Sequence, residues 1–345
     1  MRVVVCPDKF RGTASAAEVA AAIEAGVRRH AGAHAQVACL PAADGGEGTL
    51  EALGGPNRTS LVTGPLRALV EAEWRLVGDT AIVEMARASG LLLAGGAEGN
   101  DPLAATTAGT GELIAEAVAS GARRVIVGVG GSATTDGGLG ALDAMSPLAR
   151  LAGVSVVVAC DVRTRFCDAA RIFGPQKGAS PPQIELLTRR LERLVDLYHE
   201  RYGIDVSEMP RAGAAGGLAG GLAAGLRAEL APGFEVIATE VGLPEAIEGA
   251  DLVITGEGRL DAGSFDGKVV GGVLEMAAEA GVPAGVVVGA REPGTDPADW
   301  RSPAGASPLT RLVVLTERYG AERSMGDTLS AVRDAAADLA ANLVS

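Results

Sequence analysis

Short apolar runs of strand length recur along the chain and alternate with helical patterns. The first run, R-V-V-V-C, covers residues 2–6, and the later ones cover residues 124–127, 154–159, 252–255, 284–288 and 312–315. Runs of this length that are rich in β-branched residues predict buried strands. Because helical patterns separate several of them, we expect crossover connections and a largely parallel sheet.

The polar residues that flank the apolar runs predict where two helices begin. Ser15 and Glu18 form a capping-box pattern, which opens a helix that runs to about Arg29. Ser180-Pro181 opens a second helix. Its apolar positions recur at spacings of three or four residues and are Ile184, Leu187, Leu191, Leu194 and Tyr198. The second segment therefore predicts an amphipathic surface helix.

Two further segments have patterns of their own. Residues 59–85 combine short apolar stretches with turn signals such as Gly64-Pro65, which predict a small antiparallel or mixed sheet. Residues 212–226 are almost entirely Ala, Gly and Leu, which is consistent with a linker or with closely packed segments. Because leucine recurs every four residues in the second half of this segment, we favour a close-packed helix, although each interior glycine costs about 1 kcal/mol.

Composition narrows the class of protein. The chain has 345 residues, of which 48% are hydrophobic and 3% aromatic, so it can bury a large aliphatic core, and its length suits two domains. The net charge of −13 argues against a nucleic-acid partner, which would require a basic footprint. No apolar run approaches the roughly 18 residues of a membrane span. The four cysteines show no pairing or zinc-site spacing, so we expect reduced thiols in the cytoplasm.

Glycine and charged residues gather in loops directly after predicted strands, where open α/β sheets bind ligands. The first such loop, P-D-K-F-R-G-T at residues 7–13, carries Asp8, Lys9 and Arg11 in front of a capped helix. Cations beside a helix amino terminus form an anion site for a carboxylate or phosphate. A solvated loop is the alternative, and the position after a strand favours the anion site.

A second loop, P-A-A-D-G-G-E-G-T, covers residues 41–49 and contains Asp44 and Glu47. Its glycines leave backbone amides open, and its carboxylates can bind Mg²⁺ or accept a proton from a substrate hydroxyl. The alternative interpretation is an Asp-Gly turn followed by a glutamate that starts a helix.

The third loop, residues 128–140, has the highest density of glycine. Six glycines are joined there by the polar residues Ser132, Thr134, Thr135 and Asp136. This composition is suited to placing backbone N–H groups around phosphates while a carboxylate binds a metal. Residues 128–133 also match the dinucleotide pattern G-x-G-x-x-A, but the later glycines disfavour the helix that this fingerprint should open.

The fourth loop follows the predicted strand at residues 252–255. Glu257 and Asp261 are candidates for a metal or base role there, and Lys268 is a candidate for neutralising phosphate charge. The stretch is not a Walker A motif, because Val269 stands where Ser or Thr is required. Nucleotide binding is therefore expected from another architecture.

A fifth signal combines Asp161, directly after a predicted strand, with Lys177 in F-G-P-Q-K-G-A. Asp161 is a candidate catalytic carboxylate, and Lys177 is a candidate for binding a phosphate or a substrate carboxylate, although turn residues explain Gly174-Pro175 equally well. The loops together offer many acids, several cations and no nucleophile supported by histidine. This set suits phosphoryl transfer by positioning and electrostatics better than covalent acyl chemistry.

The motifs in these loops resemble those of the type-1 glycerate kinase family. In chain order they are D-K-F-R-G-T, A-D-G-G-E-G-T, G-T-G-E-L-I, G-V-G-G-S-A-T-T-D-G-G-L-G, A-C-D-V, F-G-P-Q-K-G-A, G-A-A-G-G-L and I-T-G-E-G-R-L-D. They span residues 1 to about 290, and the ordered set is highly specific. The resemblance implies ATP-dependent phosphorylation of D-glycerate, usually to 2-phosphoglycerate.

The resemblance also implies an α/β fold of two domains. A Rossmann-like domain with a largely parallel sheet is expected in residues 1–58 and 241–345, and a second α/β domain with a mixed sheet is expected as an insertion at residues 59–240. The expected partners are D-glycerate and ATP with Mg²⁺, without nucleic acid or membrane. The expected location is the cytoplasm. The sequence leaves the oligomeric state open, with a homodimer as one candidate.

Roles within the site are assigned by chemistry, as hypotheses. We assign catalysis to Asp44, Asp136, Asp161 and Lys268, with Asp44 and Asp136 as Mg²⁺ ligands and Asp161 as a candidate base. The residues assigned to substrate binding are Asp8, Lys9, Arg11 and Lys177. The residues assigned to ATP binding are Gly45, Gly46, Gly130, Gly131, Ser132, Gly256 and Glu257.

Two other functions are consistent with the sequence. A nicotinamide-dependent oxidoreductase of a small hydroxy acid fits the dinucleotide pattern and the parallel sheet, and it would bind NAD(H) in place of ATP. A non-catalytic binding protein for a small phosphorylated acid would bind its ligand without turnover. Release of ADP in the presence of D-glycerate distinguishes the kinase from both.

Overall fold

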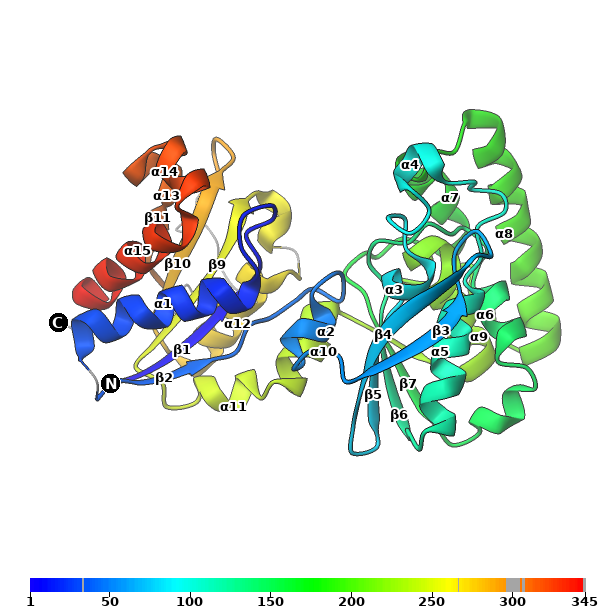
Figure 1. Ribbon diagram of the computed structural model, residues 1–345, viewed down its shortest axis with the longest axis horizontal. Helices are drawn as coiled ribbons and strands as arrows, with labels where there is room; N and C mark the ends of the chain where they lie inside the picture. The colour runs from blue at the N-terminus through cyan, green and yellow to red at the C-terminus, as the bar shows by residue number, and fades with distance from the viewer. Residues whose placement is uncertain (33, 266, 296–304, 306–307, 344–345) are drawn as a thin grey trace. The chain divides into compact units, whose positions relative to one another are not determined.

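The computed structural model describes residues 1–32, 34–265, 267–295, 305 and 308–343, and the chain divides into two compact units (Figure 1). Unit 1 consists of Met1–Asp44 and Phe234–Ser345, and unit 2 consists of Gly45–Gly233. The sequence placed the insertion at residues 59–240. The chain enters unit 2 earlier than this because Gly45 already packs there, with the carbonyl oxygen of Ala159 2.5 Å from where a Cβ would stand.

Unit 1 is built on a five-stranded sheet in the order β11-β10-β9-β1-β2, and all of its strand pairs are parallel. Its strands are β1 (Arg2–Pro7), β2 (Gln36–Cys39), β9 (Leu252–Leu260), β10 (Ala284–Arg291) and β11 (Leu309–Val314). β1 lies between β2 and β9, so that Val4 pairs with Ala38 on one side and with Val253 on the other. The prediction of a parallel sheet is confirmed.

Helices cover both faces of the unit 1 sheet. The strands are apolar on both sides, so both faces must be shielded from water. Val3 and Val5 of β1 face α1 and α15, whereas Val4 and Cys6 face the side covered by α10, α11 and α12. The helices of unit 1 are α1 (Ala16–Ala31), α10 (Gly233–Glu240), α11 (Leu243–Ile247), α12 (Val269–Ala280), α13 (Leu315–Tyr319), α14 (Ala321–Gly326), α15 (Thr328–Leu343) and the 3-10 turn η5 (Ala262–Phe265). The predicted capping box at the start of α1 is present, because the Ser15 hydroxyl accepts the Glu18 amide and the Glu18 carboxylate accepts the Ser15 amide.

β9 is longer than the sequence predicted. The apolar run ends at Thr255, and the following glycines and charged residues read as a loop, yet β9 continues to Leu260 because β10 pairs with it along this length, with Ala290 opposite Arg259. Gly256 serves this pairing, since a Cβ there would stand 2.0 Å from the carbonyl oxygen of Val287. Glu257 is therefore held on a strand.

Unit 2 is built on a six-stranded mixed sheet in the order β3-β4-β5-β6-β7-β8. Its strands are β3 (Arg58–Thr63), β4 (Leu69–Val77), β5 (Thr80–Glu84), β6 (Arg124–Gly128), β7 (Ser155–Ala159) and β8 (Glu229–Ala231). The first three are antiparallel, and β5 to β8 are parallel. The small sheet predicted for residues 59–85 is one half of this larger sheet, because β5 pairs with β4 on one edge and with β6 on the other.

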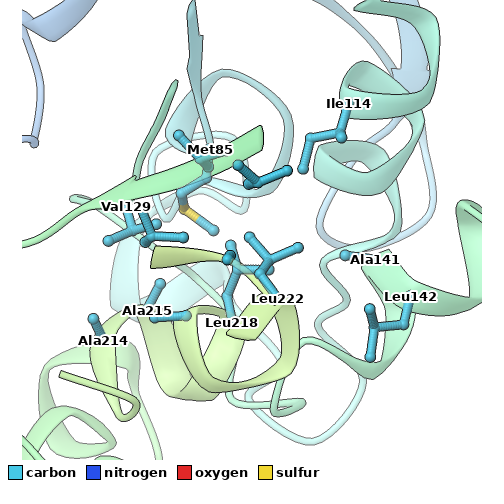
Figure 2. Close-up of a cluster of buried hydrophobic side chains, with 14 of the residues drawn as sticks. Met85, Ile114, Val129, Ala141, Leu142, Ala214, Ala215, Leu218 and Leu222 are labelled. Atoms are coloured by element: carbon cyan, nitrogen blue, oxygen red, sulfur yellow. The ribbon is translucent and has the colours of Figure 1, made fainter. Parts of the chain in front are cut away.

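The helices of unit 2 pack around one large apolar cluster. Figure 2 shows Met85, Val129, Leu218 and Leu222 converging there, with Ile114 contributed by α5. The longer helices are α5 (Ala108–Ala119), α6 (Leu139–Ala144), α8 (Pro181–Tyr202) and α9 (Leu218–Leu226); the shorter ones are α2 (Thr49–Ala52), α3 (Ala86–Ser89), α4 (Gly96–Gly99), α7 (Ala169–Phe173), η1 (Leu148–Leu151), η2 (Phe166–Asp168), η3 (Pro175–Lys177) and η4 (Ala214–Gly217). Throughout the described ranges, no helix combines the length and the apolar character that a membrane crossing requires.

The close-packed helix predicted for residues 212–226 forms only in its second half. α9 begins at Leu218, because Ala215 and Gly216 have φ values of 53° and 67°, which interrupt the helical path. This turn packs against the third loop: the Gly137 amide donates to the Gly216 carbonyl at 3.0 Å. Tertiary contact, and not the local leucine spacing, therefore decides where the helix starts.

Candidate active site

A cavity of about 440 Å³ lies in unit 1, where the parallel strands end. The residues around it follow β1, β2, β9 and β11 or belong to the ends of β9 and β10, as expected for a ligand site in an open α/β sheet. Its charged lining residues are Asp8, Asp44, Glu257, Asp261, Lys9, Arg11, Arg259 and Lys268. Acids and cations in one cavity can bind a small anion and exchange protons with it.

The loop after β1 is fixed by its backbone, so that its charged side chains line the cavity. The Asp8 amide donates to the Gly256 carbonyl at 2.8 Å, and the Lys9 amide donates to Asp8 Oδ1 at 2.7 Å. Phe10 is buried and exchanges backbone hydrogen bonds with Ala14 at 2.8 and 2.9 Å. The sequence predicted this loop as an anion site, and the structure places Asp8, Lys9 and Arg11 in the cavity.

Asp8 lies in an environment that favours its protonated form. Burial, and then the negative charge of Asp44, raise the pKa of Asp8 to about 6. The Lys9 amide and the positive charges of Lys9 and Arg11 oppose this shift. Asp44 and Asp8 are therefore close enough to repel each other, and a cation bound between them and a substrate would relieve the repulsion.

Glu257 has the properties of a proton acceptor near neutral pH. Burial is the main cause that raises its pKa to about 7, with smaller contributions from Asp8 and Asp261, while a hydrogen bond from Ser264 and the charge of Lys268 lower it. Its Oε1 atom is buried without a hydrogen-bond partner in the described part of the chain. An acceptor of this kind is suited to a hydroxyl group of a bound substrate.

The segment after β9 places a cation at the start of a helix. The Asp261 amide donates to Ser264 Oγ at 2.9 Å and the Ser264 amide donates to Asp261 Oδ1 at 3.0 Å, which closes the turn. Lys268 is the residue before α12 and lines the cavity. Residue 266 of this segment lies outside the described residues. The ammonium group and the helix amino terminus together attract an anion.

A second group of predicted residues gathers in unit 2, at the ends of β5, β6 and β7. A Cβ at Gly130 would stand 2.5 Å from the Cα of Gly46, and one at Gly45 would stand 2.5 Å from the Ala159 carbonyl oxygen. The second and third loops are thus packed directly on each other. Packing within unit 2 therefore explains why Gly130 and Gly45 are glycines, the first against Gly46 and the second against Ala159.

Asp136 is partly buried, and its carboxylate is bound by its own loop and by Thr107 at the start of α5. Its carboxylate accepts the amide and the hydroxyl of Thr107 at 2.8 and 2.9 Å, together with the amides of Gly138 and Gly140 at 3.1 and 3.3 Å. Burial raises its pKa, and these four hydrogen bonds oppose the shift. Both oxygens are engaged by the protein, so the geometry favours Asp136 as an organiser of the loop over its assignment as a Mg²⁺ ligand.

Lys177 is buried and bound to the same loop. Its Nζ donates to the Thr134 carbonyl at 2.6 Å, and burial lowers its pKa to about 7, against the opposing charge of Asp136. Asn100, which the sequence did not single out, donates to the carbonyls of Ala133 and Lys177 at 3.0 and 2.9 Å. A single asparagine in the sequence does not reveal that it will connect two distant loops.

The remaining assigned residues also belong to unit 2. Asp161 Oδ1 accepts the Gly233 amide at 2.9 Å, which ties the end of β7 to the segment that leaves the unit. Gly131 has a φ of 70°, and Ser132 forms a backbone bridge with Gly90. The assigned residues thus form two groups, one in each unit. Among the residues that the structure describes, no cluster of three or more His, Cys, Asp or Glu side chains is arranged to hold a metal ion.

Two units of α/β architecture, with charged and glycine-rich loops at the carboxyl ends of their parallel strands, define an enzyme that acts on a small anionic substrate. The model of the glycerate kinase family matches residues 3–147 and 145–343. The chain therefore belongs to the glycerate kinase family and is a kinase.

Individual relatives agree with this assignment. Glycerate 2-kinase of Escherichia coli (strain K12) is 42% identical over 314 residues, which cover 80% of this chain and 82% of that protein. Glycerate kinase of Bacillus subtilis (strain 168) is 38% identical over 320 residues, covering 82% and 83%. A crystal structure named for glycerate kinase 2 of Salmonella typhimurium LT2 superimposes with a TM-score of 0.83 at 34% identity, covering 100% of this chain and 98% of that one. Kinase activity thus replaces the oxidoreductase and the non-catalytic binding protein as the function.

Proposed function

We propose that the enzyme transfers the γ-phosphoryl group of ATP, with Mg²⁺, to D-glycerate and forms 2-phosphoglycerate. The observation that carries the proposal is the unit 1 cavity, which brings four carboxylates and four cations together at the strand ends of a glycerate kinase family member. The name of the Escherichia coli relative, glycerate 2-kinase, supports the 2-position as the site of transfer.

The acceptor binds in the unit 1 cavity. Lys9 and Arg11 pair with the carboxylate of glycerate, because both cations stand on the fixed loop after β1 and a guanidinium binds a carboxylate with two parallel hydrogen bonds. Asp8 binds a hydroxyl group of the same substrate. These contacts position the acceptor, which is the main contribution a protein makes to phosphoryl transfer.

Glu257 takes the proton of the reacting hydroxyl. The hydroxyl oxygen forms a bond to the γ-phosphorus, the bond between that phosphorus and the β–γ bridging oxygen breaks, and ADP leaves. The proton passes to Oε1 of Glu257, the buried oxygen that has no partner in the described residues. Its pKa of about 7 suits a base at neutral pH.

The nucleotide requires positive charge and open amides. Lys268 is our candidate for the phosphates in unit 1, and the loops containing Gly45, Gly46 and Gly130–Ser132 are our candidates in unit 2. Asp44 offers carboxylate oxygens, the ligand type that Mg²⁺ prefers, and its repulsion of Asp8 fits a cation at this position. When bound, Mg²⁺ would neutralise charge on the β- and γ-phosphates. The four cysteines are free thiols, in keeping with our proposal of a cytoplasmic enzyme.

The test is an ADP-release assay with purified protein, ATP and Mg²⁺. We expect turnover with D-glycerate, with rates at least about 10²-fold lower for L-glycerate and for hydroxy acids that lack the second hydroxyl. Phosphorus NMR of the product identifies the 2- or the 3-phosphate. Turnover of NADH without consumption of ATP, or binding of D-glycerate without turnover, would refute the proposal.

A further inference from the structure

Glu84 and Arg87 are two charged residues of unit 2 without an assigned role. Glu84 ends β5, and its side chain is only 5% exposed. Its Oε1 accepts the amides of Gly48 and Leu50 at 3.1 and 2.8 Å. These amides belong to the start of α2, a helix whose own N-cap residue, Gly48, has no side chain to provide a cap. A glutamate 34 to 36 positions away in the sequence therefore caps this helix.

Arg87 compensates the buried carboxylate and binds α2 by a second route. Its Nε donates to Glu84 Oε2 at 3.2 Å, and its other nitrogens pair with Glu51 of α2 and Glu73 of β4. Burial raises the pKa of Glu84, while the Leu50 amide and the Arg87 guanidinium oppose the shift. Without these partners, a carboxylate at this depth would carry a large desolvation cost.

The segment that Glu84 and Arg87 hold continues directly from the proposed ATP-binding loop. The Thr49 hydroxyl donates to the Gly46 carbonyl at 2.8 Å and closes the turn that leads into α2. Gly46 packs against Gly130, and Gly45 packs against Ala159. The loop is thus fixed at the ends of β6 and β7 by backbone packing, and at the end of β5 by one buried carboxylate.

We propose that Glu84, supported by Arg87, is a positioning residue for phosphoryl transfer, because it holds the Gly45–Thr49 loop in the conformation that binds the nucleotide. The inference rests on the proposed function, which assigns this loop to ATP. A misplacement of about 1 Å at such a loop is enough to cost about 10²-fold in rate. Glu84 itself touches no substrate in this scheme and acts only through the loop.

The alternative is that the pair only stabilises unit 2. The two roles differ in kinetics. Loss of folded enzyme lowers the apparent kcat and leaves both KM values unchanged, whereas a misplaced nucleotide loop raises KM for ATP and lowers kcat. KM for D-glycerate stays unchanged in both cases, because Lys9 and Arg11 belong to unit 1.

The experiment combines steady-state kinetics with hydrogen–deuterium exchange of the full chain. Glu84→Ala removes the cap, and Glu84→Gln keeps the shape and a carbonyl acceptor but places an amide N–H₂ group against Arg87. Glu116→Gln, an exposed glutamate of α5 in the same unit, is the matched control. We expect faster exchange at residues 46–52, KM for ATP raised about tenfold and kcat lowered about 10²-fold in Glu84→Ala, with smaller changes of the same kind in Glu84→Gln.

Two results would overturn the inference: unchanged exchange at residues 46–52 in both variants, or faster exchange with both KM values as in the wild type. If Glu84→Ala does not fold, the exchange rates and KM values of Glu84→Gln decide between the positioning role and a purely stabilising role. Failure of the proposed function is recognised separately, since the wild type and Glu116→Gln would then release no ADP with D-glycerate.

Discussion

Burial decides the protonation of single carboxyl groups in the unit 1 cavity. Glu257 and Asp8 are both carboxyl groups on or beside strands, and burial is the largest cause that raises their pKa values, to about 7 and about 6. In each case a neighbouring carboxylate adds to the shift, and nearby cations reduce it. The cavity therefore contains groups that change charge near neutrality, as acid–base catalysis requires.

The pH dependence of activity follows from Glu257. Since the base must be ionised, kcat/KM for D-glycerate should rise with pH and level off above about pH 7. Glu257→Gln should lower kcat by about 10²-fold or more and remove the limb centred near that pH. Steady-state rates measured across the pH range check this. A Gln variant with a wild-type profile would exclude Glu257 as the base.

The same variant has a stability signature. Because the pKa of Glu257 is raised above its ordinary 4.5 in the folded protein, its favourable contribution is complete below about pH 4.5 and is lost as the pH rises through about 7. Glutamine does not ionise, so the melting temperature of Glu257→Gln relative to the wild type should increase between about pH 5 and pH 8. A difference that is independent of pH would contradict the assigned shift.

Single residues also show which site features local sequence reveals. Lys9 and Arg11 could be predicted, because they stand between an apolar run and a capping box. Glu84, Arg87 and Asn100 could not. Glu84 does close the apolar run A-I-V-E, but its partners Gly48 and Leu50 are distant in the sequence and reach it only through the sheet.

At the scale of elements, loops of unit 2 are fixed by contact with one another. The third loop approaches the second so closely that Gly130 faces Gly46 without room for a side chain. The φ value of Gly130 lies outside the left-handed region, so packing, and not backbone conformation, demands glycine there. The glycine-rich motifs thus encode loop-on-loop packing as well as any approach to phosphate.

Gly130→Ala tests this packing. The new Cβ would stand 2.5 Å from the Cα of Gly46, so the two loops must separate. We expect a loss of about 1–3 kcal/mol in the free energy of unfolding and a lower kcat. Gly326→Ala is the control. Nothing lies within 4 Å of a Cβ at this position, and the φ of Gly326 lies outside the left-handed region. The free energy of unfolding of this variant should therefore change by less than about 0.5 kcal/mol. Equal melting temperatures for the two variants would refute the packing argument.

At the scale of the whole molecule, the chain places its two groups of candidate residues in two different compact units. Unit 1 carries the cavity with Lys9, Arg11 and Glu257, and unit 2 carries the packed glycine loops. Each unit has its own sheet and its own apolar core. Ligands that bind mainly to different units should therefore slow hydrogen–deuterium exchange in different segments of the chain.

Hydrogen–deuterium exchange with each ligand separately tests this division. D-glycerate alone should slow exchange at residues 8–13 and 257–265 of unit 1, because its contacts reduce local opening of the backbone around the cavity. ATP with Mg²⁺ should slow exchange at residues 45–52 and 128–135 of unit 2, with additional protection near Asp44 and Lys268 of unit 1, which we assign to Mg²⁺ and the phosphates. L-lactate, which lacks the second hydroxyl of glycerate, is the control ligand. Protection by D-glycerate confined to unit 2 would contradict the assignment of the acceptor to the unit 1 cavity.

The sequence by itself determined the fold class, the capping box of α1, the positions of most strands along the chain and the family, because each of these depends on local periodicity or on contiguous motifs. Tertiary structure decided the rest. Pairing with β10 extended β9 through Glu257, and the packing of Gly45 on Ala159 moved the boundary between the units to residue 45. Burial shifted the pKa values, and the cap that Glu84 provides joined residues far apart in the chain. Such effects depend on which surfaces meet after folding, and no window along the chain contains that information.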